Sequence, residues 1–373
     1  MKKLVLLMMV FILGLSTVSC AASIDPKTGP SVSIGPIATA SPGAAPSASP
    51  QAKKDIDMRA LIWKYDDTYG STVRAAMEKW AAAYSQELGI NIKLTMYDAA
   101  DDMAKQIEQA TIIAGEKPDI VIINLAEVAN GKVLVDMFKT AGIPFLFYNK
   151  QPAEETVQSV LVDTGTIFIG TLARQAGDMQ GEILADLYKK NPAIDRNGDG
   201  TLQYVMLKGE ANNNEAIART QYSVETAVAN GLKLEQLGQT LVCDWDQAKA
   251  QEAITATWAS FGDKIEVIFA NNDMMALGAV AALNSVGFNT GVAGEPSVVV
   301  IGVDAVDSAL ESIKKGGMTA TVKQDGDAMG KANIRIAVNG AQGKEWLDGT
   351  DYKYTDDKFK CIRIPYAKIT EVK

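Results

Sequence analysis

Polar side chains, many of them Asp and Asn, follow a series of short apolar runs in this sequence of 373 residues. Apolar runs of strand length lead into the segments KYDDTY, YNKQP, LKGEANNNEAIAR, ANND and GVDA. Carboxylates, amides and guanidinium groups recognise hydroxyls through hydrogen bonds, whereas covalent catalysis requires an activated nucleophile. The pattern therefore favours noncovalent binding of a polar ligand over catalysis.

The absence of histidine from the whole sequence also argues against an enzyme. Histidine is the commonest general base near neutral pH, it completes the usual Ser and Cys triads, and it is a frequent ligand of zinc and iron. The adjacent carboxylates Asp66 and Asp67 leave a sugar-processing enzyme as an alternative. Neighbouring residues at a strand end point in different directions, however, so we expect no enzymatic activity.

Apolar runs of strand length alternate with longer amphipathic segments along most of the chain. A first series contains RALIWKY, NIKLTMYD, DIVIIN and IPFLFYN, and a second contains LQYVMLKG, KIEVIFANND and SVVVIGVD. Strands that are apolar on both faces and joined by helices are typical of parallel sheets covered on both sides. The sequence therefore predicts an α/β fold with two doubly wound lobes, in which ligands bind beyond the carboxyl ends of the strands.

The N-terminal segment predicts export and a lipid anchor. Two lysines precede an uncharged apolar run over 4–15, and small and polar residues lead from that run to Cys20. This is the pattern of a signal peptide over 1–19, whose removal leaves Cys20 as a lipidated N-terminus. Residues 20–57 are dominated by Pro, Ala, Ser, Gly and Thr, which predicts a flexible tether. Ordinary secretion with an incidental cysteine is the alternative.

The charge and cysteine content limit the partners of the folded body. The sequence carries 45 acidic and 36 basic residues, a net charge of −9, and no basic block, so we expect no nucleic acid as a partner. Cys243 and Cys361 lie far apart in sequence, which favours buried thiols over a disulfide. We expect a monomer in the periplasm or at the cell surface, attached to the membrane through its lipid.

Several phrases together resemble the galactose/glucose-binding protein family of ABC importers. They are WKYDDTY, YNKQP, DRNGDGTLQ, VMLKGE, ANNDMMALGA and IGVDA, and they follow the family's order from about Met58 to the C-terminus. The resemblance implies a type I periplasmic binding protein whose two lobes are joined by three hinge segments. One lobe is expected over 58–169 plus about 326–354, and the other over 170–324 plus about 357–373.

The same resemblance implies a set of sugar-binding residues. Seven positions keep a suitable residue type, namely Asp67, Tyr69, Asn149, Arg219, Trp245, Asn272 and Asp304. Three depart from the family: Asn213 replaces a histidine, Glu215 an aspartate and Gln324 an asparagine. The two aromatic residues would cover the apolar faces of a pyranose, and the polar ones would bind its hydroxyls. Taken singly, the Asp and Asn residues could be helix caps, Tyr69 a surface residue, and Arg219 a salt-bridged helix residue.

The segment 195–203 has the spacing of an EF-hand calcium loop. Its expected oxygen ligands at loop positions 1, 3, 5, 7 and 9 are Asp195, Asn197, Asp199, the Thr201 carbonyl and Gln203. The twelfth position, which should be Glu, is Met206. The family resemblance supplies a distant carboxylate, Glu266, and implies a structural Ca²⁺. An Asx-rich surface turn is the alternative.

The resemblance as a whole implies a lipoprotein that binds D-glucose or D-galactose and delivers it to the membrane permease of an ABC importer. A chemoreceptor is a second expected partner. The three departures keep an alternative open, in which the same fold binds a pentose, another sugar or a nucleoside, as a transport or sensor protein. We do not expect a transcription regulator on the same fold, because the predicted signal peptide and tether occupy the position of its DNA-binding domain.

Overall fold

The computed structural model describes residues 55–153, 165–355 and 359–372. The signal peptide, Cys20 and almost all of the predicted tether lie outside these ranges. The chain divides into the units 1–51 and 52–373, and every described residue belongs to the second unit. None of the helices in the described ranges is both long and apolar enough to cross a membrane.

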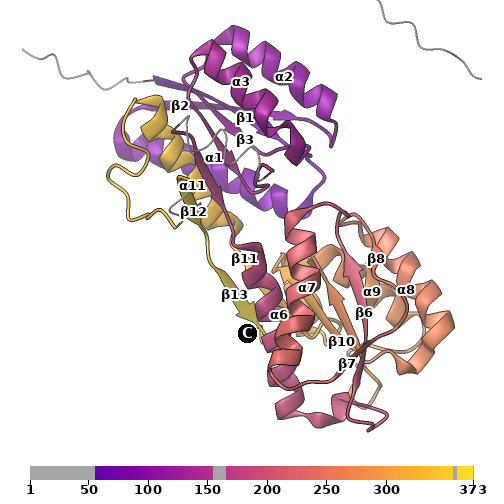
Figure 1. The fold of residues 1–373 in the computed structure, drawn as a ribbon. Coiled ribbons are helices and arrows are strands. Elements are labelled where there is room, and N and C mark those ends of the chain that lie inside the picture. The colour runs from indigo at the N-terminus through magenta and orange to yellow at the C-terminus, as the bar shows by residue number, and fades with distance from the viewer. Residues whose placement is uncertain (1–54, 154–164, 356–358, 373) are drawn as a thin grey trace, which may run out of the picture. The chain divides into compact units, whose positions relative to one another are not determined.

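The first lobe is built on a six-stranded sheet with the order β12-β5-β4-β3-β1-β2 (Figure 1). All five strand pairs are parallel. Helices α1 and α11 pack on one face of the sheet, and α2 and α3 pack on the other. The strands are β1 (Asp55–Ile62), β2 (Asn91–Asp98), β3 (Ile120–Ile123), β4 (Phe145–Tyr148), β5 (Ile167–Gly170) and β12 (Cys361–Arg363). The helices are α1 (Thr68–Leu88), α2 (Met103–Glu116), η1 (Val128–Asn130), α3 (Gly131–Ala141) and α11 (Gly326–Ala341).

The second lobe repeats this plan around the order β13-β11-β10-β9-β6-β7, with β8 paired to β6. Helices α6 and α7 cover one face, and α8, α9 and α10 cover the other. β13 is antiparallel to β11, and the other pairs are parallel. The strands are β6 (Leu202–Lys208), β7 (Leu234–Gln236), β8 (Leu241–Val242), β9 (Val267–Ala270), β10 (Val299–Asp304), β11 (Ala320–Gln324) and β13 (Tyr366–Ile369). The helices are α6 (Ala173–Lys190), η3 (Pro192–Ile194), α7 (Asn214–Ala229), α8 (Gln247–Phe261), η4 (Gly262–Lys264), α9 (Asp273–Asn284) and α10 (Asp307–Lys314).

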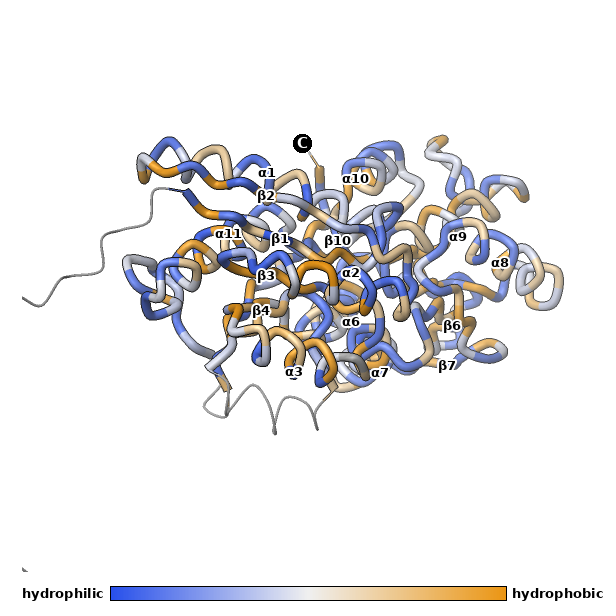
Figure 2. The backbone as a smooth tube through the Cα atoms, turned by 90° about the horizontal axis from the view of Figure 1, so that it is seen from above, coloured by the Kyte–Doolittle hydropathy of each residue, from blue (hydrophilic) through white to orange (hydrophobic). Residues whose placement is uncertain are grey.

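The α/β fold predicted from the alternating runs is confirmed. Strands β3 and β4 are buried along their whole length, as expected for strands covered by helices on both faces. Figure 2 shows hydrophobic backbone along these two strands and mixed colours along α1 and α8. Cys243 and Cys361 are both buried, in different lobes.

The chain passes between the lobes three times, and the last passage differs from the expected one. It crosses after β5, after β11, and between β12 and β13. The expected second lobe included residues from about 357 onward, but β12 pairs with β5 in the first lobe. The third crossing therefore falls at 364–365, because a three-residue apolar strand extends the first sheet before the chain leaves it. The first lobe also begins at Asp55 instead of Met58.

Close contact between α1 and α11 generates a prediction about stability. A Cβ on Gly330 would lie 2.9 Å from the Met77 backbone nitrogen, whereas a Cβ on Gly115 in α2 would meet nothing within 4 Å. We expect Gly330→Ala to lower the free energy of unfolding by about 1–3 kcal/mol through overpacking. The control Gly115→Ala should raise it by about 0.5–1 kcal/mol through helix propensity. Thermal denaturation checks both, and equal effects would contradict the packing.

Candidate ligand-binding site

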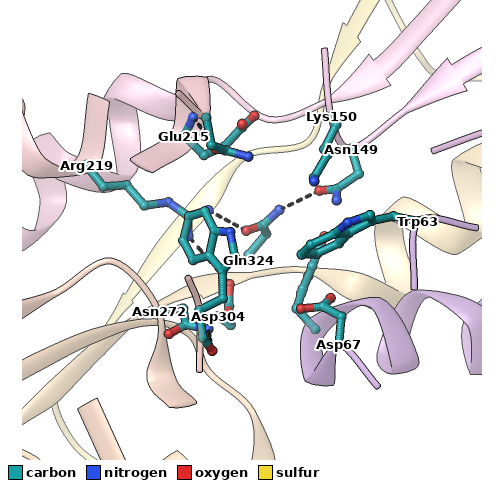
Figure 3. Close-up of a pocket in the computed structure, with 12 residues that line it drawn as sticks. Trp63, Asp67, Asn149, Lys150, Glu215, Arg219, Asn272, Asp304 and Gln324 are labelled. Carbon is teal, nitrogen blue, oxygen red and sulfur yellow. Dashed lines mark hydrogen bonds and ion pairs between the residues drawn. The ribbon is translucent and has the colours of Figure 1, made fainter. Parts of the chain in front are cut away.

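All ten residues predicted for the sugar site line one cavity between the lobes (Figure 3). The first lobe contributes residues that follow β1 and β4, and the second lobe contributes residues that follow β6, β8 and β9 and the last residues of β10 and β11. Trp63 and Lys150 line the cavity as well, although the sequence reasoning did not select them. The complete lining is Trp63, Asp67, Tyr69, Asn149, Lys150, Asn213, Glu215, Arg219, Trp245, Asn272, Asp304 and Gln324.

Three of the polar residues cap helices and line the cavity at the same time. Asp67, Asn213 and Asn272 are the N-caps of α1, α7 and α9, and each accepts a backbone N–H with a side-chain oxygen. A capping side chain must lie at the carboxyl end of the preceding strand, which is where a doubly wound sheet opens toward ligand. The cap interpretation is therefore correct, and it does not exclude ligand binding.

Arg219 is held by residues near the points where the chain crosses between lobes. Its Nη1 donates to the Asn271 carbonyl at 2.7 Å, and its Nη2 donates to Gln324 Oε1 at 2.7 Å and to Tyr366 Oη at 2.9 Å. The nearest carboxylate, Asp304, is 3.9 Å away, too far for a hydrogen bond. The guanidinium is thus fixed in a buried position mainly by neutral acceptors.

Two cavity-lining residues each bury a polar atom that makes no hydrogen bond of normal geometry within the described chain, namely Arg219 Nε and Tyr69 Oη. Gln324 lies close enough to the Tyr69 hydroxyl to lower its pKa, but without the geometry of a hydrogen bond. Tyr69 is only 7% exposed, so the surface interpretation is wrong. Leaving a buried donor unpaired costs about 1–3 kcal/mol. A ligand that carries hydroxyl acceptors would remove this cost at both positions.

Burial shifts the carboxyl groups of the cavity toward their neutral form. Removal from water raises the pKa of Asp67 and of Glu215, although nearby cationic side chains oppose the shift in both cases. Burial raises the pKa of Asp304 most strongly, against the charge of Arg219, and the neighbouring Asp273 adds to the increase. A protonated carboxyl can donate to a hydroxyl as well as accept from one.

The three departures from the family share the interior of the cavity. Gln324 spans the lobes, since its Oε1 accepts from Arg219 and its Nε2 donates to Asn149 Oδ1 at 3.4 Å. Asn213 donates to Glu210 Oε2 at 3.2 Å while its oxygen caps α7. The cavity measures about 50 Å³, less than the ~150 Å³ of a protein cavity that holds benzene. Entry of a six-membered ring therefore requires the lobes or these side chains to move.

The cavity is also a place of unusual backbone conformation. Asn149, Trp245 and Asp304 have positive φ angles of 61°, 65° and 122°. Such conformations are uncommon for residues other than glycine and cluster where function requires them. The Trp245 ring passes so close to Gly209 that any larger residue at that position would collide with it.

Trp63 and Lys150 form part of the wall contributed by the first lobe. Lys150 Nζ lies 3.5 Å from the centroid of the Trp63 ring, and the Trp63 indole donates to Asp101. Both residues lie within the phrases WKYDDTY and YNKQP. Their closeness in sequence to predicted site residues was the available signal that they belong to the site. The sequence does not show which way a side chain at a strand end points, because that direction depends on local backbone angles.

The predicted calcium loop surrounds a buried carboxylate. Glu266 is 1% exposed and accepts from the backbone nitrogens of Arg196 at 2.6 Å, Asn197 at 3.3 Å and Gln203 at 3.1 Å. The Asn197 amide contacts oxygens of Asp199 and Gln203 at 3.1 and 3.0 Å. Over the described part of the chain, no three acidic, His or Cys side chains gather closely enough to hold a metal. A cation here would depend on amide and backbone oxygens as well.

Comparisons with known proteins identify the family. A model described as periplasmic binding protein domain matches residues 60–345. The D-galactose/methyl-galactoside binding periplasmic protein of Haemophilus influenzae is 34% identical over 325 residues, 87% of this chain and 92% of that protein. A putative rhizopine-binding protein of Rhizobium meliloti is 27% identical, over 75% of this chain and 82% of that protein.

Solved structures show the same fold. A solute-binding protein of Bacillus halodurans with bound myo-inositol has a TM-score of 0.68 at 24% identity, and the match covers 86% of this chain and 96% of that one. This chain belongs to the periplasmic binding protein family. Its relatives are substrate-binding proteins of transporters, and it is a binding protein and not an enzyme.

The contacts of Tyr366 generate a second prediction. Its hydroxyl accepts from Arg219 and donates to Thr171 Oγ1 at 2.9 Å. Because Tyr366→Phe removes one acceptor from buried Arg219 and one donor from buried Thr171, we expect it to lower the free energy of unfolding by about 1–3 kcal/mol. Tyr204→Phe is the control. The Tyr204 hydroxyl donates to Gln236 Oε1 at 3.1 Å, and neither residue lines the cavity. Similar losses in urea denaturation of the two variants would contradict a special role for Tyr366.

Proposed function

We propose that the chain binds a monosaccharide between its lobes and delivers it to an ABC importer. The observation that carries the proposal is the pair of unpartnered atoms, Arg219 Nε and Tyr69 Oη, on residues that line a cavity with aromatic and polar walls. Aromatic rings suit the C–H faces of a sugar, and amides, carboxyls and guanidinium suit its hydroxyls. Family membership supports the transport role.

A hexose is the ligand that we propose, with D-galactose or D-glucose as first candidates. The Haemophilus influenzae relative is a D-galactose/methyl-galactoside binding protein, whereas curated relatives at lower identity include ribose and xylitol binding proteins. Glu215 and Gln324 are each one methylene longer than the corresponding residues of the galactose/glucose-binding family, and the extra length reduces the space left for the ligand. A smaller sugar is therefore the second candidate.

Tyr69 provides the test of the sugar site. Its hydroxyl has no partner in the described chain, so Tyr69→Phe should leave the free energy of unfolding unchanged or slightly higher. The same change should weaken sugar binding by about tenfold, the equivalent of one hydrogen bond. Calorimetry with D-galactose, D-glucose, D-ribose and myo-inositol would measure the affinity of both proteins.

Tyr84→Phe serves as the control, because Tyr84 is buried in α1 outside the cavity lining and is expected to leave affinity unchanged. If the unmodified protein produced no heat with any of the four compounds, the proposed ligand class would be wrong. Equal affinities of Tyr69→Phe and the unmodified protein would remove Tyr69 from the site.

The location of the protein follows the same reasoning. The relatives are periplasmic binding proteins, which supports a periplasmic location. We further propose that Cys20 carries the lipid anchor, with the residues after it as a tether that lets the two lobes reach a permease. A chemoreceptor remains a second proposed partner.

We also propose that the loop over 195–203 holds a structural Ca²⁺ together with Glu266. Asp195, Asn197 and Asp199 have the loop spacing, and Glu266 places a buried carboxylate against the loop backbone. A buried carboxylate is costly unless it is hydrogen-bonded or bound to a cation, which supports this assignment. The cation would neutralise the loop's carboxylates and join it to the strand that begins at Val267.

Chelation provides the test. Calcium at about 100 times its Kd should stabilise the folded protein by about 2.7 kcal/mol relative to a chelator, because only the folded loop binds it. Glu266→Gln should abolish the difference in melting temperature, whereas Glu252→Gln, on the exposed side of α8, should preserve it. Identical melting curves with calcium and with chelator would show that the loop is an Asx-rich turn only.

A further inference from the structure

Glu210 lies outside the cavity lining but holds two residues that belong to it. It follows β6 in the second lobe, and it accepts from Lys150 Nζ at 3.3 and 3.4 Å across the cleft. It also accepts from Asn213 Nδ2 at 3.2 Å within its own lobe. One carboxylate therefore joins walls of the cavity that belong to different lobes.

Lys150 is an unusual partner because it is almost completely buried, at 5% exposure. Within the first lobe its ammonium lies over the Trp63 ring and 3.5 Å from the Ala126 carbonyl. Asp67 and Glu215 interact with its charge at longer range. A desolvated ammonium needs a close counter-ion, and among the residues that the structure describes Glu210 of the other lobe provides a carboxylate within ion-pair distance.

The Lys150–Glu210 pair depends on the position of the lobes. Its two residues belong to separate sheets that are joined by the three crossing segments, so rotation of one lobe away from the other breaks the pair. An interaction present in only one of two states raises the population of that state. Glu210 is 30% exposed, so solvent weakens the pair without removing it.

A second ion pair at the same rim provides an internal comparison. Lys249 Nζ lies 2.7 Å from Asp244 Oδ2, and both residues belong to the second lobe. They line an outer cavity of about 360 Å³, together with Lys150 and Glu210. The rim thus contains one ion pair that connects the lobes and one that lies within a single lobe.

We propose that Glu210 is a positioning residue that holds the lobes closed and slows ligand release, without itself contacting the ligand. It does so through an interlobe clasp made of Lys150, Glu210 and Asn213. Asn213 is one of the departures from the family, and its amide is already occupied by Glu210. The clasp therefore also determines which donors of this wall remain for the ligand. The effect on release rests on the proposed sugar-binding function, whereas the effect on closure does not.

The experiment measures closure without any ligand. Spin labels at Lys105→Cys on α2 and Glu252→Cys on α8 report the distance between the lobes, since both positions are exposed. We expect Glu210→Gln to lower the ratio of closed to open full-length protein about tenfold, because the variant loses a part-buried charge pair between the lobes. Asp244→Asn, the same chemical change at the intralobe pair, should leave it unchanged.

A double variant separates the clasp from a general effect on folding. Adding Lys150→Met to Glu210→Gln should open the lobes little further, because the partner is already lost. For a sugar that binds the unmodified protein, stopped-flow dissociation should be about tenfold faster in Glu210→Gln. An unchanged distance distribution in Glu210→Gln would overturn the clasp. If no sugar bound the unmodified protein, the proposed function would be contradicted. The distance measurements, which need no ligand, would still test the clasp.

Discussion

The buried guanidinium of Arg219 is the group on which the geometry of the cavity depends. A cation in this position must be satisfied by fixed acceptors, and they come from the ends of β9 and β11 and from β13. Tyr366 continues the network to Thr171 at the first crossing. The residue that faces the ligand cavity is therefore connected to segments where the chain passes between lobes, and movement of the lobes and occupation of the cavity are physically linked.

The rest of the site follows from the carboxyl ends of parallel strands. Helix caps such as Asp67 and Asn272 place polar side chains there, and left-handed residues such as Trp245 turn the chain back toward the cavity. Burial raises the pKa of Asp304, and the nearby charge of Arg219 opposes that shift. Two lobes of ordinary architecture thus produce a polar cavity that is closed by groups from both.

Much of this could be predicted from the sequence, for identifiable reasons. Strands such as β3 and β4 are apolar along their whole length, and the phrases after the strands are distinctive in combination. The third crossing was misplaced because β12 is only three residues long and resembles a loop. Trp63, Lys150 and Glu210 were missed because their importance lies in contacts between distant segments. The extra methylenes of Glu215 and Gln324 could be read from the sequence, but their shared occupation of the cavity could not.

The central claim is that a sugar ring binds beside Arg219 and Tyr69, where two buried polar atoms have no partner in the described chain. A crystal structure of the protein with D-galactose tests it most directly. We expect electron density for one ring between the lobes, with hydroxyls within hydrogen-bond distance of Arg219 Nε and Tyr69 Oη. Sugar density elsewhere on the protein, with only water beside these two atoms, would contradict it.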